Sequence, residues 1–455
     1  MVIEDELKRI PDYTRFFTLD EMLAKTRSVA DMHPDIYSYK ILGHSTDGES
    51  IPMLKVGSGA TRVLLFACPH PNEPIGAMLI QFLLDELISN ESLRHNYTWY
   101  LLPCVDPDGT RLNEGWFAGP YTIRNYARHF YRPPSAEQVE WTFPIHYKDL
   151  HFDTPIPETK ALMKAFELAQ PDMVYSLHNA GFGGVYYYIS HDLKEVYQDF
   201  HEIPEARGLA LSLGEAEMPW AVEFAPAVYS FGSIQDAYDY LEKYSDTPPA
   251  ELIQGGGSSG DYLKNMSGSK DPLLLITELP YFQAKQIADQ TPTDQSRREV
   301  ILAGVEQART STLAVKAILE RIDSEMTLDS RFYRAVTLFN KQILDGLSSK
   351  ETWAKEGTNM DQVATVAQKT DELYIGSFYR LLIASMLTRA LDLQLATTRS
   401  DTLLKAKTDL ETLLETWIQK LEHNLDYEAI PIKNLVKVQY GALLAVLEST
   451  FVKET

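Results

Sequence analysis

Cysteine is scarce in this chain, with only Cys68 and Cys104 among 455 residues. Two cysteines allow at most one disulfide, which excludes a fold built on disulfides and suits a reducing compartment. Both cysteines end apolar stretches, a position that favours small core side chains over metal thiolates. The N-terminal residues are acidic and lack the apolar segment of a signal peptide, so we expect a cytoplasmic protein.

Long apolar runs and positive charge are also in short supply. No stretch approaches the roughly 18 residues that a membrane-spanning helix needs, so we expect no membrane association. The 42 Lys and Arg side chains face 64 Asp and Glu side chains, and the formal net charge is -22. A charge of this sign repels phosphate backbones, which argues against nucleic acid as a partner.

Proline almost disappears from the last third of the chain. Only Pro431 occurs after residue 292, and apolar residues recur there at steps of three and four positions. This pattern predicts an all-α C-terminal domain over residues 293–455. Three roles are open for it: capping a cleft, restricting substrate size or forming a homo-oligomer interface. The expected helices are 300–322, 330–347, 360–397, 401–425 and 432–452.

Residues 1–292 instead alternate strand-like and helix-like segments. The apolar runs 62–68, 98–104, 172–177 and 272–277 are typical of strands that are buried on both faces. Strands that alternate with helices predict an α/β domain with a mainly parallel, mixed sheet and helices on both faces. Further strands are expected at 37–42, 51–56 and 184–189, and helices at 75–88, 157–168, near 190–214 and at 232–244.

Two candidate metal ligands follow the first buried strand. His70 and Glu73 stand three residues apart in a turn before the expected helix at 75–88. Ligands bind at the carboxyl ends of strands in open α/β sheets, because the loops there converge. Zinc accepts imidazole nitrogen and carboxylate oxygen, and its catalytic sites keep three protein ligands and one open position. Alone, the His-x-x-Glu pair is a weak signal, since a surface turn can contain it by chance.

A third ligand should come from another strand end. His178 directly follows the apolar run 172–177, and the small and polar residues that begin at Asn179 leave room around its ring. The alternative is a buried histidine bonded to a carbonyl group. Competing histidines in less regular sequence are His129, His146 and His151.

Glu278 comes directly after the very apolar stretch 272–277. A carboxylate at such a place is either paired or chemically active. Desolvation would raise its pKa toward the value that a general base needs near neutral pH. The alternative is a glutamate that simply leaves the sheet into solvent.

Together, these residues resemble the zinc carboxypeptidase A-like metallopeptidase family over roughly residues 35–290. In that family a His-x-x-Glu pair and a later histidine bind zinc, and a glutamate near the end of the domain activates the water. The resemblance implies a carboxypeptidase-like fold for residues 1–292 and zinc as the cofactor. It assigns zinc to His70, Glu73 and His178, and the catalytic role to Glu278.

The family also has two functional arginines between the first ligands and the third. The resemblance implies Arg111 as the group that polarises the scissile carbonyl and Arg128 as the group that binds the substrate carboxylate. A guanidinium fork suits a carboxylate because it offers two parallel donors. Arg124 and Arg132 are rivals of Arg128, and solvated structural arginines are the alternative for all of them.

The chain departs from the family pattern in places that concern the substrate. Ala127 replaces the usual asparagine, and the family's mobile tyrosine would fall near Ile253. Tyr262 and Tyr281 are close enough in sequence to substitute for it. Gly260, in the loop that resembles the specificity segment, leaves no large side chain to select a residue. The predicted substrate-binding residues are Arg124, Arg128, Arg132, Asn179 and Tyr262.

The sequence therefore predicts a zinc-dependent hydrolase that cleaves a peptide or amide bond, as a metallocarboxypeptidase. One alternative is an amidohydrolase that acts on N-acyl amino acids or cell-wall-type peptides, which Ala127 and Gly260 favour. The other is a non-catalytic binding protein that keeps the fold. The expected partner is a peptide or an acylated amino acid.

Overall fold

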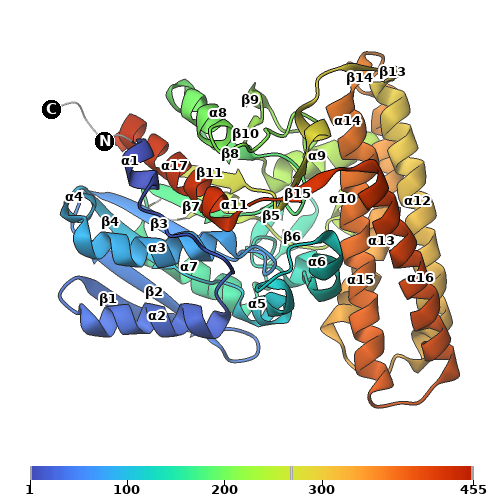
Figure 1. The fold of residues 1–455 in the computed structure, drawn as a ribbon, viewed down its shortest axis with the longest axis horizontal. Coiled ribbons are helices and arrows are strands. Elements are labelled where there is room, and N and C mark those ends of the chain that lie inside the picture. The colour runs from blue at the N-terminus through green and yellow to red at the C-terminus, as the bar shows by residue number, and fades with distance from the viewer. Residues whose placement is uncertain (1–2, 267, 269, 452–455) are drawn as a thin grey trace.

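The computed structural model describes residues 3–266, 268 and 270–451 (Figure 1). Within these residues a nine-stranded sheet forms the centre of the molecule, in the order β1-β2-β4-β3-β7-β11-β8-β10-β9. Its strands are β1 (Tyr37–His44), β2 (Ser50–Gly57), β3 (Thr61–Ala67), β4 (Tyr97–Leu102), β7 (Met173–Leu177), β8 (Tyr186–Ile189), β9 (Glu223–Ala225), β10 (Val228–Ser230) and β11 (Leu273–Glu278).

The central strands of the sheet are parallel, and its outer parts are mixed. β4, β3, β7 and β11 run parallel to one another, while β1, β2 and β8 each pair antiparallel with a neighbour. The register places Ala67 of β3 and Thr277 of β11 beside Leu177 of β7. Because these three strands end at the same level, the residues that follow them meet at one edge. The mainly parallel, mixed sheet predicted from the sequence is confirmed.

Helices cover both faces of the sheet. On one face α3 (Ile75–Ser89) packs on side chains such as Val63 and Leu65 of β3. On the other face α7 (Pro157–Ala169) and α11 (Ser259–Asn265) pack on the alternate residues Leu64 and Phe66. Successive side chains of a strand point to opposite faces, so the apolar runs of the sequence serve both layers.

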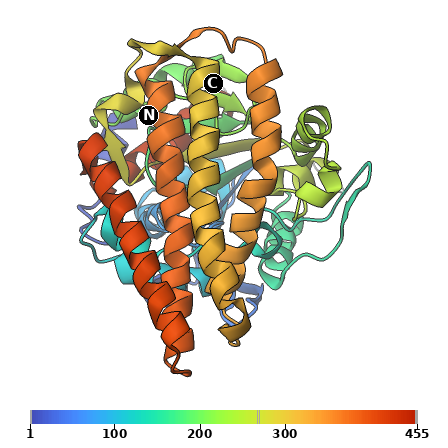
Figure 2. The ribbon, with the colours of Figure 1, turned by 90° about the vertical axis from the view of Figure 1, so that its right-hand side faces the viewer.

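Four long helices form a bundle beside the α/β part (Figure 2). They are α12 (Arg297–Ile322), α13 (Arg331–Glu356), α15 (Gly376–Leu395) and α16 (Asp401–Asn424). The stretch 360–397, expected to be one helix, instead contains β14 (Val363–Thr365), α14 (Val366–Thr370), a π-helical turn (Asp371–Ile375) and α15. The capping box of Thr365 and Gln368 explains why α14 starts anew there.

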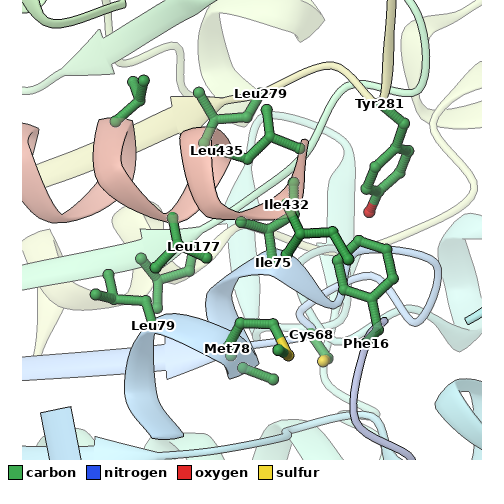
Figure 3. Packing of buried hydrophobic residues seen from close by; sticks show 14 of the residues in the cluster. Phe16, Cys68, Ile75, Met78, Leu79, Leu177, Leu279, Tyr281, Ile432 and Leu435 are labelled. Atoms are coloured by element: carbon green, nitrogen blue, oxygen red, sulfur yellow. The ribbon is translucent and has the colours of Figure 1, made fainter. Parts of the chain in front are cut away.

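The last helix, α17 (Ile432–Phe451), does not join the bundle. It lies against α3 and α8 (Tyr197–Glu205) of the α/β part, and Figure 3 shows Ile432 and Leu435 packed beside Ile75. A Cβ atom on Gly441 would lie 2.8 Å from Ile203 of α8, so the two helices approach closely. The chain thus leaves the α/β part near residue 292 and returns to it. The predicted boundary at 292/293 assigns this helix to the C-terminal domain, although the helix packs on the α/β part. Val452, the last residue of the expected helix, lies outside the described residues.

Shorter elements connect these layers. They include α1 (Ile3–Leu7), α2 (Leu19–Met32), α4 (Glu91–Asn96), α5 (Pro107–Asn113), α6 (Ile123–His129), α9 (Ile234–Tyr244), α10 (Pro249–Leu252), β5 (Ile145–Tyr147), β6 (Leu150–Phe152), β12 (Phe282–Ala284), β13 (Pro292–Ser296) and β15 (Tyr427–Ala429). Strand β15 pairs with β12, which joins the returning chain to the α/β part. Among the described helices, none combines the length and the apolar character needed to cross a bilayer.

Candidate metal centre

The carboxyl ends of β3, β7 and β11 carry the residues that the sequence singled out. The chain leaves β3 through Cys68, whose φ of 54° lies in the left-handed region that few non-glycine residues adopt. This turn leads to His70 and Glu73, and the Glu73 N–H donates to the carbonyl of His70 at 3.1 Å. His178 directly follows β7, and Glu278 is the last residue of β11.

His70, Glu73 and His178 form a cluster of possible metal ligands. Each offers one ligand atom, and the three atoms lie within 4.8 Å of one another. His178 Nδ1 is 3.2 Å from Glu73 Oε2, and the centres of the two imidazole rings are 4.9 Å apart. All three side chains are buried. The Nδ1 atom of His70 is buried without a hydrogen-bond partner in the described part of the chain, so its lone pair is available to a cation.

The competing histidines lie elsewhere. Among the described residues this cluster is the one group of three or more His, Cys, Asp or Glu that could hold a metal ion. His146 contacts the carboxylate of Asp153 at 2.8 Å and the ring of His151 at 5.1 Å between ring centres. His129 packs against Gly115, where a Cβ atom would lie 2.5 Å from its ring. None of the three joins the cluster.

Glu278 lies beside the cluster, with its Oε1 atom 3.7 Å from His178 Nδ1. Burial raises the pKa of the Glu278 carboxyl well above its usual range. His178 and Arg132 pull this pKa down, while the charges of Glu73 and Glu217 push it further up. A desolvated carboxylate that holds a proton readily is suited to proton transfer.

Glu140 also lies at the site, although it is not among the residues predicted from the sequence. Its Oε1 atom lies 3.6 Å from His178 Nε2, on the side of the ring opposite Glu73. Ser176 and Ser259 donate hydrogen bonds to this carboxylate at 2.9 to 3.0 Å. Burial pushes the pKa of Glu140 up, but the nearby His178 and the hydrogen bonds from Ser259 outweigh it and leave the pKa lowered. Carboxylates placed behind metal-binding imidazoles orient the ring and make it more basic.

The carboxylates around His178 give the site an excess of negative charge. Burial lowers the pKa of His178, yet Glu140, Glu73 and Glu278 together raise it to about 10. The same negative potential that favours a proton on this ring favours a divalent cation, which competes for the same lone pair. Two nitrogen ligands and one carboxylate form a donor set that suits zinc and leaves a fourth position for water.

The predicted arginines differ in where they lie. Arg132 is half-buried at the cluster, where Nη1 donates to Glu73 Oε1 at 3.1 Å and Nε to Gln138 Oε1 at 3.3 Å. Arg111 donates to Glu49 and Asp20, each at 2.7 Å, and so connects α5 to the start of α2. The structure therefore brings Arg132, not Arg111, to the ligands.

Arg128 and Arg124 both lie on α6. Arg128 is exposed, and Arg124 forms an ion pair with Glu415 of α16. The contacts of Arg124 thus attach α6 to the bundle and do not involve the cluster. In the described structure neither side chain forms a hydrogen bond or an ion pair with His70, Glu73 or His178.

Asn179 and the two tyrosines suggested as substitutes hold the scaffold together. The Asn179 N–H donates to Glu73 Oε2 at 3.3 Å, and its side-chain oxygen accepts from Ile75 N–H and from the Tyr281 hydroxyl. Tyr262 donates to Glu167 of α7, within the apolar layer under the sheet. These hydrogen bonds hold Asn179, Tyr262 and Tyr281 to other groups of the protein.

Gly260 does not open a pocket. A Cβ atom at this position would lie 2.2 Å from the ring of Phe231 and 3.0 Å from Leu274. The glycine permits α11 to pack tightly against this ring. The prediction that its missing side chain leaves open space for a substrate is therefore wrong.

The helical bundle reaches the site through α15. The Tyr379 hydroxyl accepts a hydrogen bond at 3.2 Å from the N–H of Gly181, in the loop that follows His178. Tyr379 is 38% exposed, so its ring lies at the surface while its hydroxyl reaches this loop. Its neighbour Phe378 fills the space beside Gly181, where a Cβ atom would lie 2.7 Å from the ring. No local sequence pattern indicates this contact, because Tyr379 lies on a helix of the C-terminal bundle.

Two imidazoles and a carboxylate around one position, with a further buried glutamate beside them, define a mononuclear metal site of the kind that hydrolases use. A family model described as zinc carboxypeptidase matches residues 22–271, which is more than half of the chain. The chain belongs to the zinc carboxypeptidase family, and the zinc of that family fits this donor set.

The relatives match over limited lengths. Carboxypeptidase B of Astacus astacus is 29% identical over 105 residues, which cover 22% of this chain and 35% of the relative. Zinc carboxypeptidase A 1 of Drosophila melanogaster is 28% identical over 111 residues, 22% of this chain and 26% of the relative. The chain thus spans about a third or less of these relatives. The solved carboxypeptidase A of Helicoverpa armigera matches with 13% identity and a TM-score of 0.35, over 58% of this chain and 65% of that one.

Proposed function

We propose that this protein is a zinc-dependent hydrolase that cleaves a peptide or amide bond, as a metallocarboxypeptidase. The observation that carries this proposal is the meeting of His70, Glu73 and His178 within 4.8 Å at one edge of the sheet. The buried carboxylate of Glu278 lies 3.7 Å from His178, where a base for a water molecule is needed. Membership of the zinc carboxypeptidase family supports the same function.

Zinc, when bound by His70, Glu73 and His178, supplies a Lewis acid that polarises the scissile carbonyl and makes water more acidic. Glu278 accepts a proton from the attacking water at its carboxylate and delivers it to the leaving nitrogen. Its raised pKa suits both halves of this transfer, since the group must bind the proton and then release it. Glu140 keeps the His178 ring in a fixed orientation.

Arg132 takes the electrostatic role that the family resemblance implied for Arg111. Its guanidinium donates to Glu73 and is half-buried, so its positive charge acts next to the ligands in a place with little water. A fixed donor beside developing negative charge stabilises the transition state. Arg111 forms ion pairs with Asp20 and Glu49, and its role is to hold α5 to the start of α2.

Two candidate activities differ in the substrate that they cleave. A metallocarboxypeptidase needs a cation for the terminal carboxylate, yet Arg128 is exposed and Arg124 is paired with Glu415. The second candidate is an amidohydrolase of N-acyl amino acids or cell-wall-type peptides, and since N-acyl amino acids carry the same terminal carboxylate, this arrangement does not separate the two activities. A hydrolysis screen over dipeptides, D-amino-acid peptides and N-acyl amino acids distinguishes them. Cleavage of dipeptides supports the first activity, cleavage of N-acyl amino acids alone supports the second, and no cleavage by zinc-loaded protein supports a binding protein.

We further propose that the bundle caps the cleft, which the contact of Tyr379 with Gly181 supports. A homo-oligomer through the bundle stays a prediction. A cytoplasmic location also stays a proposal, supported by a composition with only two cysteines.

A further inference from the structure

The helical bundle has a partly open cavity of about 550 Å³ between α12, α15 and α16. Figure 2 shows these helices side by side along the bundle. Leu413, Trp417 and Leu421 of α16 give the cavity an apolar wall. Pockets that bind small molecules have volumes of roughly 300–1,000 Å³ and are mostly apolar, with a few polar groups that fix the ligand. The cavity is built of residues that the metal centre does not use.

Arg380 of α15 lines this cavity without a carboxylate partner. Its Nη2 atom donates to the Ser377 hydroxyl at 3.0 Å, and within the residues that the structure describes it forms no ion pair. The carboxylate whose charge acts on it is Glu372, and both oxygens of Glu372 bind Lys350 at 2.7 and 2.8 Å. Desolvation lowers the pKa of Arg380 to about 10. A half-buried cation without a partner destabilises the fold unless an anion reaches it.

A second cation lines the same cavity. Lys420 of α16 forms no ion pair in the described part of the chain. The acid that lines the cavity, Glu306, lies 3.5 Å from Arg309. In a chain with 64 acidic and 42 basic side chains, partners for cations are abundant. The half-buried Arg380 and the exposed Lys420 outnumber the single lining carboxylate of Glu306, so the residues that line the cavity carry a net positive charge within a strongly acidic protein.

We propose that this cavity binds a small amphipathic carboxylate. The carboxylate contacts the Arg380 guanidinium, which offers two parallel donors, and Lys420 adds a second positive charge. The apolar part of the ligand packs on Trp417 and Leu413. The ligand would contact Arg380, the residue next to Tyr379 on α15. The hydroxyl of Tyr379 contacts the loop after His178. The proposal does not depend on the reaction at the metal centre.

Calorimetric titration of the zinc-loaded full chain with octanoate tests the proposal, with 1-octanol as the uncharged analogue. Octanoate should bind, and Arg380→Gln should weaken the binding roughly tenfold or more, since 1.4 kcal/mol corresponds to a factor of ten. Arg380→Lys should restore part of the affinity because it keeps the charge. The exposed Arg399→Gln is the matched control and should bind as the wild type does. Octanoate bound at the metal centre instead would be insensitive to Arg380→Gln.

Three results would overturn the proposal: no heat of binding with octanoate, equal affinity for octanol, or unchanged affinity in Arg380→Gln. Thermal unfolding supplies a second readout that does not depend on binding. A ligand-binding arginine that is desolvated and unpaired should destabilise the free protein, so Arg380→Gln should raise the melting temperature. If that variant does not fold, Trp417→Phe decides the question, because it should remove the fluorescence change that octanoate causes in the wild type.

Discussion

Glu140 Oε1 lies 3.6 Å from His178 Nε2, while the other ring nitrogen of His178 faces the cluster. The carboxylate is held in turn by Ser176 and Ser259, so its position is fixed from two sides. This relationship assigns the two ring nitrogens different tasks. Nδ1 is directed at the cation position and Nε2 at the carboxylate that orients the ring.

Replacing Glu140 by glutamine should therefore weaken zinc binding. Loss of such an orienting carboxylate lowers metal affinity by roughly 10–100-fold. Competition of the purified protein with a zinc-binding indicator measures the dissociation constant. Glu137→Gln is a matched control in the same segment, because Glu137 pairs with Arg334 away from the cluster. An unchanged dissociation constant in Glu140→Gln would contradict a role of Glu140 in zinc binding.

Glu278→Gln should abolish most of the activity and keep the metal. The substitution removes the proton acceptor but preserves shape, so the rate constant kcat should fall by about 10²–10⁴-fold. Metal analysis of the same sample should still find one zinc per chain, since Glu278 is not one of the clustered ligands. Near-normal turnover with zinc bound would refute the role of Glu278.

The two arginines give a paired comparison. Arg132→Gln should lower kcat by roughly 10²–10³-fold, because it removes a fixed positive charge beside Glu73. Arg111→Gln should leave kcat within about a factor of two, since its contacts are surface ion pairs that contribute little. Steady-state kinetics on any substrate found in the screen measures both. The reverse ranking would restore the assignment made from the sequence.

Asp106 predicts a pH dependence of stability. Burial raises its pKa to about 7, with Glu158 and Asp108 adding to the shift, while the bond from Gly109 N–H and the charge of Arg331 oppose it. The folded protein thus binds this proton more tightly than the unfolded chain. The stability that the group contributes is present below the unfolded pKa, near 4, and is lost as the pH rises through about 7.

Asp106→Asn should keep the bond to Gly109 and remove this pH dependence. The variant should gain stability relative to the wild type between pH 4 and pH 8, by up to roughly 4 kcal/mol from a shift of about three pKa units. Denaturant unfolding of both proteins across this range measures the difference. A difference that does not change with pH would contradict the raised pKa.

Several residues of the candidate site could be predicted from the sequence because they stand at the ends of strands. His178 comes right after an apolar run, and Glu278 ends another, so parallel register alone brings them together. Glu140 could have been found by the argument used for Glu278, since it too is an acid within an apolar stretch, Val139 to Pro144. The local sequence pattern is enough to predict residues of this kind.

Other features depend on long-range packing, which no local pattern contains. Arg111 and Arg132 both suit an electrostatic role by type, and only the direction of their side chains separates them. Tyr379 reaches the loop after His178 from a helix of the bundle. Helical periodicity predicts that α17 is a helix, but not that it packs on α3 of the α/β part.

The location of zinc in crystals of the full chain tests the central claim most directly. Diffraction data on both sides of the zinc absorption edge should give one strong anomalous peak at the carboxyl edge of the sheet. The peak should lie roughly 2.0–2.2 Å from a nitrogen of His70, a nitrogen of His178 and a carboxylate oxygen of Glu73. A peak that does not contact His178, or no peak at this edge in zinc-soaked crystals, would contradict the account.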